Sequence, residues 1–253
     1  MAWDPDVYMK FANERTRPAM ELLARVPLSV PARAIDLGSG PGNSTALLAV
    51  RWPNARIDGL EFSPEMLSKA RASGIRARWI EGDVESWNPS APYDLVFSNA
   101  TLHWIADHRV LLPRLMGYVT GGGAFAFQVP RNFDAPSHVL MREVANSGPW
   151  TAKLANACQV NVLPPDAYFE ILAPLARSLD VWETTYFHVL EGDDPVLAWV
   201  SGTGLRPFVQ PLDADEREDF VAQYRARLRK AYPRRADGKT LFPFQRLFVV
   251  AQR

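Results

Sequence analysis

The sequence predicts an α/β fold in which a mostly parallel, seven-stranded sheet carries helices on both faces. Short apolar runs alternate with segments of helical spacing over about 100 residues in the middle of the chain. A glycine-rich turn, residues 38–42, follows the first apolar run and leads into the first of these helices. The composition, with 47% hydrophobic and 22% charged residues, is typical of a globular protein.

Five strands are expected in this alternating part of the chain. They are residues 33–37, 55–60, 76–80, 93–98 and 124–129. The glycine-rich turn is followed by a segment with apolar residues at helical spacing, residues 43–51. Ser63 is a typical N-cap with Pro64 at the first helical position, and Asp107 can cap a helix over residues 108–118.

Two regions interrupt the alternation. In residues 3–26, Asp4 and Pro5 indicate a helix start, and Pro18 is expected to divide the stretch into two helices because proline lacks a backbone N–H. Residues 132–175 are expected to be helical. The remaining elements are a strand over 179–188, helices over 195–200 and 213–232, and a final strand over 247–251.

The length of 253 residues fits one large domain with insertions. Its expected parts are N-terminal cap helices (1–30), a ligand-binding core (31–130), a helical cap insertion (131–176) and C-terminal strands with a further helical insertion (177–253).

Charge and apolar content exclude several classes of protein. Lys and Arg number 28, as do Asp and Glu, so a dedicated nucleic-acid binder is not expected. The longest apolar run, near residues 121–129, is too short to span a bilayer. A single cysteine rules out an internal disulfide and a cysteine-rich metal site. We expect a cytoplasmic monomer that acts on a small molecule and contains no metal.

The glycine-rich turn, Asp36-Leu-Gly-Ser-Gly-Pro-Gly42, is the most informative segment. Such turns bring a ligand close to the backbone at a helix N-terminus. A dinucleotide fold requires G-x-G-x-x-G, but Asn43 occupies the third glycine position, and Asp36 would repel a pyrophosphate. The pattern D-x-G-x-G-x-G resembles that of class I S-adenosylmethionine-dependent methyltransferases, which have a Rossmann-like fold.

Two further acids strengthen this resemblance. Glu61 ends the second strand, where a carboxylate can accept both ribose hydroxyls, and Asp83 follows the third strand, where it can accept from the adenine amino group. The segment Ser98–Trp104 resembles the motif that lines the methyl-transfer centre in many bacterial relatives. The residues expected to bind the cofactor are Asp36, Gly38, Gly40, Asn43, Glu61, Phe62, Met66, Asp83, Val84, Asn99 and Trp104.

Other segments narrow the resemblance. They include Trp3-Asp-Pro-Asp-Val-Tyr8, Met141-Arg-Glu-Val-Ala145, Thr203-Gly-Leu-Arg-Pro207 and Arg246-Leu-Phe-Val-Val-Ala251. Together they resemble the bacterial trans-aconitate 2-methyltransferases along nearly the whole chain. The resemblance implies that a methyl group passes from S-adenosylmethionine to one carboxylate of trans-aconitate, which gives a monomethyl ester.

A carboxylate is ionised at pH 7, so this reaction requires no catalytic base. The other carboxylates are expected to be held by arginine forks. The residues expected to bind this polycarboxylate substrate are Tyr8, Phe11, Arg15, Arg131, Arg142 and Arg206, with His138, Tyr186 and His188 as further polar candidates. The basic residues between Arg225 and Arg235 are expected to form a solvated helix face.

Three alternatives remain open from the sequence. The first is an N-, C- or O-methyltransferase of an uncharged metabolite, in which His103 would be the base. The second is a nicotinamide-dependent oxidoreductase, against which Asp36 and Asn43 argue. The third is a protein that binds the cofactor without catalysis.

Overall fold

The computed structural model describes residues 12–157 and 161–253. The chain divides into two compact units. We call Arg15–Pro130, Asn161–Thr184 and Arg246–Arg253 the core unit, and the described residues of Arg131–Val160 with Thr185–Gln245 the second unit. No helix in the described ranges is both long and apolar enough to cross a membrane.

A seven-stranded sheet in the order β3-β2-β1-β4-β5-β7-β6 confirms the predicted fold class. The strands are β1 (Arg33–Leu37), β2 (Arg56–Glu61), β3 (Arg78–Glu81), β4 (Tyr93–Asn99), β5 (Val119–Pro130), β6 (Ser178–Leu190) and β7 (Thr240–Gln252). The first five strands pair in parallel, whereas β7 runs antiparallel to β5. The strand order reverses between β1 and β4, and ligands of open α/β sheets bind at the carboxyl ends of the strands at such a point.

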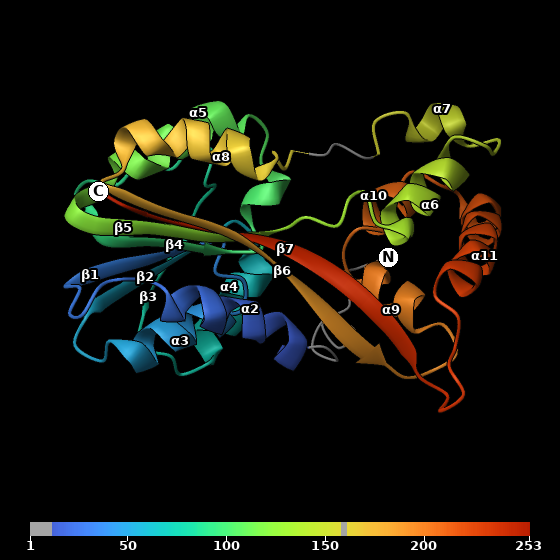
Figure 1. Cartoon of the computed structure of the whole chain (residues 1–253), viewed down its shortest axis with the longest axis horizontal. Coiled ribbons are helices and arrows are strands. Elements are labelled where there is room, and N and C mark those ends of the chain that lie inside the picture. Colours follow the sequence, from blue (N-terminus) through green and yellow to red (C-terminus); the bar gives the residue numbers. More distant parts are fainter. Residues whose placement is uncertain (1–11, 158–160) are drawn as a thin grey trace. The chain divides into compact units, whose positions relative to one another are not determined.

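Helices cover both faces of the sheet in the core unit (Figure 1). One face carries α2 (Ala12–Ala24), α3 (Asn43–Arg51) and α4 (Pro64–Ala72), and the other carries α5 (His108–Gly117) and α8 (Pro165–Leu172). The sheet residues between the two layers, including Ile35, Val96 and Phe125, are fully buried, as expected for parallel strands covered on both sides.

A buried hydrogen-bonded pair links α5 to α8. His108 Nδ1 lies 2.7 Å from the Tyr168 hydroxyl, and His108 Nε2 lies 2.8 Å from the Leu102 carbonyl. Since the carbonyl can only accept, Nε2 donates to it and Nδ1 accepts from the tyrosine. Burial lowers the pKa of His108, so this neutral arrangement is favoured at pH 7.

The expectation that Pro18 divides the N-terminal stretch was wrong. Helix α2 continues through Pro18 to Ala24. Its buried face contains Pro18 itself, Ala19, Leu22 and Leu23. Burial of these apolar side chains offsets the hydrogen bond that proline removes from the helix. The expected helix start at Asp4 and Pro5 lies outside the described residues.

The last strand is longer than its predicted range, 247–251. It begins at Thr240, and burial alternates in its first half, where Phe242 and Phe244 are buried and Pro243 between them is partly exposed. From Leu247 to Ala251 every residue is buried. The sequence prediction recognised only the continuously apolar half, because Pro243 interrupts the pattern of the first half.

The second unit is mainly helical. It contains α6 (Pro136–Ala145), α7 (Thr151–Leu154), α9 (Pro195–Ser201), α10 (Arg206–Val209) and α11 (Ala214–Ala231). Trp150, Trp199, Phe220 and Phe242 contribute to its core. Arginines in the C-terminal half of α11 and just after it form ion pairs with Glu143 on α6 and with Asp193 and Asp194 before α9. These exposed pairs support the predicted solvated face.

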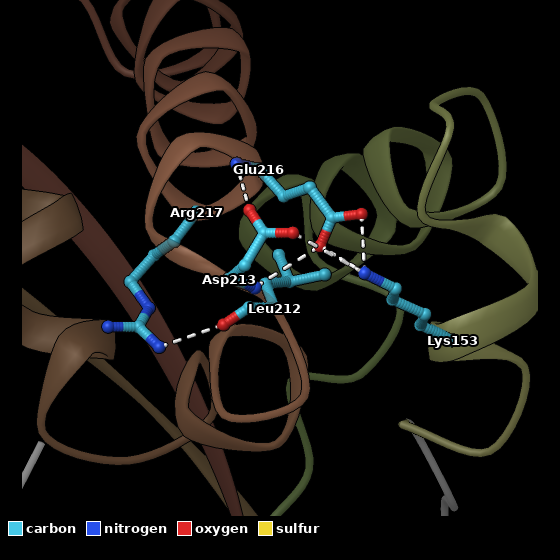
Figure 2. A network of polar contacts seen from close by, with 5 residues as sticks. All are labelled: Lys153, Leu212, Asp213, Glu216 and Arg217. Carbon is cyan, nitrogen blue, oxygen red and sulfur yellow. Dashed lines mark hydrogen bonds and ion pairs between the residues drawn. The ribbon is translucent and has the colours of Figure 1, made fainter.

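Charged residues at the start of α11 join it to α7 (Figure 2). Asp213 and Glu216 form a reciprocal capping box, and Lys153 Nζ lies 2.7 Å from Glu216 Oε1. The Arg217 guanidinium donates to the Leu212 carbonyl at 3.0 Å. The cap fixes where α11 begins, while the exposed ion pairs stabilise this contact only weakly because solvent screens them.

Candidate cofactor and substrate sites

The glycine-rich loop lies directly after β1, at the point where the strand order reverses. The Gly38 and Ser39 N–H groups both donate to the Leu60 carbonyl of β2, at 2.8 and 2.9 Å. Gly38 has a φ of +69°, and a Cβ atom there would lie 2.2 Å from the Thr101 side chain. Only glycine fits this position without displacing Thr101, which in turn donates to the Gly38 carbonyl at 3.1 Å.

Glu61 ties this loop to the end of β2. Its Oε2 accepts from the Gly40 N–H at 2.8 Å, and its Oε1 accepts from the Ser63 N–H at 2.8 Å. The carboxylate is therefore fixed in place, and each of its oxygens retains a lone pair for a further donor such as a hydroxyl. The sequence prediction gave Glu61 a role toward the ribose but did not foresee that it also holds the glycine loop.

Asp36 is completely buried behind the loop. Its Oδ2 accepts from the hydroxyls of Ser44 and Thr45 at the start of α3, both at 2.7 Å. Its Oδ1 has no hydrogen-bond partner within the described parts of the chain. Burial raises the pKa of Asp36 to about 6, and the nearby Glu61 charge acts in the same direction. A buried carboxylate oxygen without a partner favours a cationic or hydrogen-bonding ligand.

Replacing Asp36 with asparagine is expected to stabilise the fold and to weaken cofactor binding. Because the pKa of Asp36 rises from 3.8 to about 6 on folding, the ionised side chain lowers the free energy of unfolding by up to about 3 kcal/mol near neutral pH. The stability that its protonated form contributes is fully present below the unfolded pKa of 3.8 and is lost as the pH rises through about 6. Asp36→Asn should therefore be more stable than the wild type near pH 7, and the difference should shrink near about pH 4.

Denaturant unfolding at both pH values measures this difference, and calorimetry measures the cofactor affinity. An Asp36→Asn variant that is less stable near neutral pH would mean that the bonds from Ser44 and Thr45 outweigh the cost of burial.

The other predicted cofactor residues lie at the ends of neighbouring strands. Phe62 follows β2 and is 71% exposed, which is unusual for a phenylalanine and leaves its ring available to a ligand. Met66 lies in the first turn of α4 and is half-buried, and Asn43 begins α3. Asp83 Oδ1 accepts from the Glu85 N–H at 2.8 Å, which holds the loop after β3, and Val84 beside it is buried.

The segment after β4 completes this end of the sheet in the core unit. Asn99 ends β4, and its Oδ1 is buried with no partner in the described ranges. Trp104 is 57% exposed, and its ring lies 4.5 Å from that of His103. Asp36 Oδ1 and Asn99 Oδ1 are thus two buried acceptors near the ends of the adjacent strands β1 and β4, and neither has a partner in the part of the chain that the structure describes.

Two residues support the loop without having been predicted. Thr101 fills the space beside Gly38, as described above. The Trp79 ring packs against Gly59 of β2, where a Cβ atom would lie 2.6 Å from it. A glycine within a predicted strand was the available signal for such a close approach.

Three of the predicted substrate residues lie in the second unit. Arg142 on α6 is half-buried and donates to the Phe133 carbonyl at 2.9 Å. Arg206 begins α10 and is also half-buried. Neither arginine forms an ion pair with a described carboxylate. Arg131, the first residue of this segment, donates its N–H to the Gln245 carbonyl at 2.9 Å.

Tyr8, Phe11 and the side chain of Arg15 lie outside the described residues, and the backbone of Arg15 belongs to α2. Tyr186 and His188 lie in the aromatic core of the second unit, where the His188 ring stacks on Trp199 at 4.4 Å. The structure therefore favours a packing role for these two residues.

His138 connects Arg142 to the loop before Arg206. It lies one helical turn before Arg142 on α6, and burial, followed by the Arg142 charge, lowers its pKa. Its Nε2 would lie 3.3 Å from a Cβ atom at Gly204, two residues before Arg206. Arg142 and the segment that leads into Arg206 are thus both near His138.

The chain is similar in sequence to known methyltransferases. The profile of a family described as "Methyltransferase domain" matches residues 34–123. The chain is similar to the trans-aconitate 2-methyltransferases of Azoarcus sp. strain BH72, at 51% identity over 99% of both chains, and of Streptomyces avermitilis, at 51% identity over 100% of this chain and 97% of the relative.

Solved structures with this fold have much lower sequence identity. The YcgJ protein of Bacillus subtilis is 14% identical, with a TM-score of 0.61 over 94% of this chain and 98% of that one. A putative methyltransferase of Bacillus halodurans is 11% identical, with a TM-score of 0.59 over 93% and 98%. These likenesses support the fold alone.

Proposed function

The chain belongs to the trans-aconitate 2-methyltransferase family, and from that premise we propose that it transfers a methyl group from S-adenosylmethionine to one carboxylate of trans-aconitate. The product is a monomethyl ester. The observation that carries the proposal is the buried Asp36 Oδ1 behind the glycine-rich loop, which has no hydrogen-bond partner among the described residues. A carboxylate there suits a cationic amino group and repels a phosphate.

The glycine loop also argues against the nicotinamide alternative. A pyrophosphate would be bound by backbone N–H groups of such a loop. In this chain the Gly40 N–H is already bonded to Glu61 Oε2, and the Gly38 and Ser39 N–H groups are bonded to Leu60. A second carboxylate, Asp36, lies behind the same loop. These contacts favour a cofactor without phosphate.

The core unit offers the carboxylate acceptors and apolar side chains that S-adenosylmethionine would need. When bound, this cofactor supplies a methyl group on a sulfonium centre. We propose that Glu61 accepts from the ribose hydroxyls, that Asp83 binds the adenine, and that Phe62 and Met66 pack against its faces. Asp36 and Asn99 would accept from the amino end of the cofactor.

The chain then has to bind and orient a carboxylate that is already ionised at pH 7. Transfer to an anion neutralises charge, so exclusion of water and close alignment promote the reaction more than a base would. We propose that Arg142 and Arg206 hold the carboxylates that do not react, because each is half-buried without an ion pair to a described carboxylate. Arg15 and Arg131 remain further candidates.

His103 is expected to be dispensable as a base. His103→Ala should retain methyl transfer to within about tenfold, and the rate should be flat between about pH 7 and about pH 9, since a carboxylate nucleophile has no proton to lose. Loss of ring packing against Trp104 accounts for any modest decrease. A dead His103→Ala enzyme would instead support the alternative with an uncharged substrate.

A panel of carboxylic acids tests the substrate class. With labelled S-adenosylmethionine, transfer should be fastest to trans-aconitate, slower to di- and tricarboxylates of similar shape, and undetectable with their uncharged esters. Equal rates with charged and uncharged acceptors would contradict the proposal.

A further inference from the structure

Among the described residues, hydrogen bonds reach the ring of His138 at Nδ1 only. Its Nδ1 lies 3.2 Å from Ser137 Oγ and 3.4 Å from Asn132 Nδ2, and its ring meets Phe133 edge to face at 5.5 Å. Burial, with Arg142 as the second cause, lowers the pKa of His138 to about 4, so the ring is neutral at pH 7. Since Asn132 Nδ2 donates to Nδ1, the single ring proton is on Nε2.

No described residue accepts a hydrogen bond from this Nε2–H group, and the Nε2 atom is not completely buried. It faces the backbone of Gly204, where a Cβ atom would lie only 3.3 Å away. A side chain at position 204 would therefore cover the donor. Glycine leaves it open, at the segment that leads into Arg206.

We propose that His138 is a substrate-binding residue whose neutral Nε2–H donates to a carboxylate held by Arg142 and Arg206, and that Gly204 keeps this donor accessible. The inference rests on the proposed function. It adds to the two arginines a donor whose direction is fixed by Asn132 and Ser137. Charged arginines supply attraction, whereas a fixed neutral donor selects the orientation of the carboxylate.

Two conservative variants separate substrate binding from a structural role. The amide of glutamine can replace the donor at Nε2, and the amide of asparagine can replace the group at Nδ1. We expect His138→Asn and His138→Phe to raise KM for trans-aconitate about tenfold or more with kcat nearly unchanged, whereas His138→Gln should remain within about threefold. KM for S-adenosylmethionine should not change in any of them.

Gly204→Ala supplies an independent test. It should raise KM for trans-aconitate at least about fivefold, and the effects of Gly204→Ala and His138→Phe should not add, because both remove the same donor. A substrate analogue that lacks the bound carboxylate should bind wild type and His138→Phe equally. Thermal unfolding of each variant checks that the fold is intact.

Each failure has a distinct meaning. Wild-type protein with no activity on trans-aconitate would refute the proposed function. An active wild type with an unchanged KM in His138→Phe would overturn only the inference. Rescue by asparagine rather than glutamine would also overturn it, because the Nδ1 contacts would then be the ones that matter.

Discussion

Glu61→Ala is expected to weaken S-adenosylmethionine binding by about 30- to 1,000-fold, which corresponds to about 2–4 kcal/mol. The substitution removes the charged acceptor proposed for the ribose. It also releases the Gly40 and Ser63 N–H groups, which Glu61 binds at 2.8 Å each. The glycine loop would lose its link to the end of β2, so the effect should exceed that of a single contact.

Two controls belong with this measurement. Glu65→Ala removes an exposed carboxylate four residues away, which pairs with Lys69, and should leave the affinity unchanged. Glu61→Asp keeps the charge on a shorter side chain and should lose less than about tenfold. Calorimetry gives the affinities directly. Unchanged binding by Glu61→Ala would exclude Glu61 as an anchor of the cofactor.

Removing Arg142 or Arg206 is expected to lower kcat/KM for trans-aconitate by about 10- to 200-fold each. Each half-buried guanidinium lacks an ion pair to a described carboxylate, so its proposed partner is the substrate. Affinity for S-adenosylmethionine should stay within about threefold of wild type, since neither arginine belongs to the glycine, ribose or adenine segments.

Arg227→Ala is the matched control in the second unit. Arg227 is paired with Glu143 at 3.3 Å on the exposed face of α11, so its removal should leave kinetics unchanged and cost at most about 1 kcal/mol of stability. Full activity in both Arg142→Ala and Arg206→Ala would rule out these two arginines as the residues that bind the substrate carboxylates.

The core unit was predictable because its signals are local. A strand followed by a glycine turn and a helix is encoded in consecutive residues, and the acids at positions 36, 61 and 83 each follow a strand. Contacts between distant residues were not predictable in this way. Glu61 bonding to Gly40 and Thr101 filling the space beside Gly38 depend on strand order, which a single sequence does not specify.

Pro18 shows how tertiary packing overrides a local signal. Proline disfavours a helix interior, yet α2 continues through it because its apolar face is buried. His138 is a residue for which the sequence gives no local signal at all. A lone histidine carries no sequence signal for its role, and only the contacts with Asn132, Ser137 and Gly204 define which nitrogen is open.

Under the proposed function, the methyl group goes to a carboxylate. The most direct measurement is transfer from methyl-labelled S-adenosylmethionine to trans-aconitate, followed by mild alkali treatment of the product. A carboxyl methyl ester is hydrolysed under these conditions, so the label should be released as volatile methanol in proportion to the product formed. Label that stays bound to the product after alkali would indicate an N-, C- or ether-linked methyl group and would refute methyl transfer to a carboxylate.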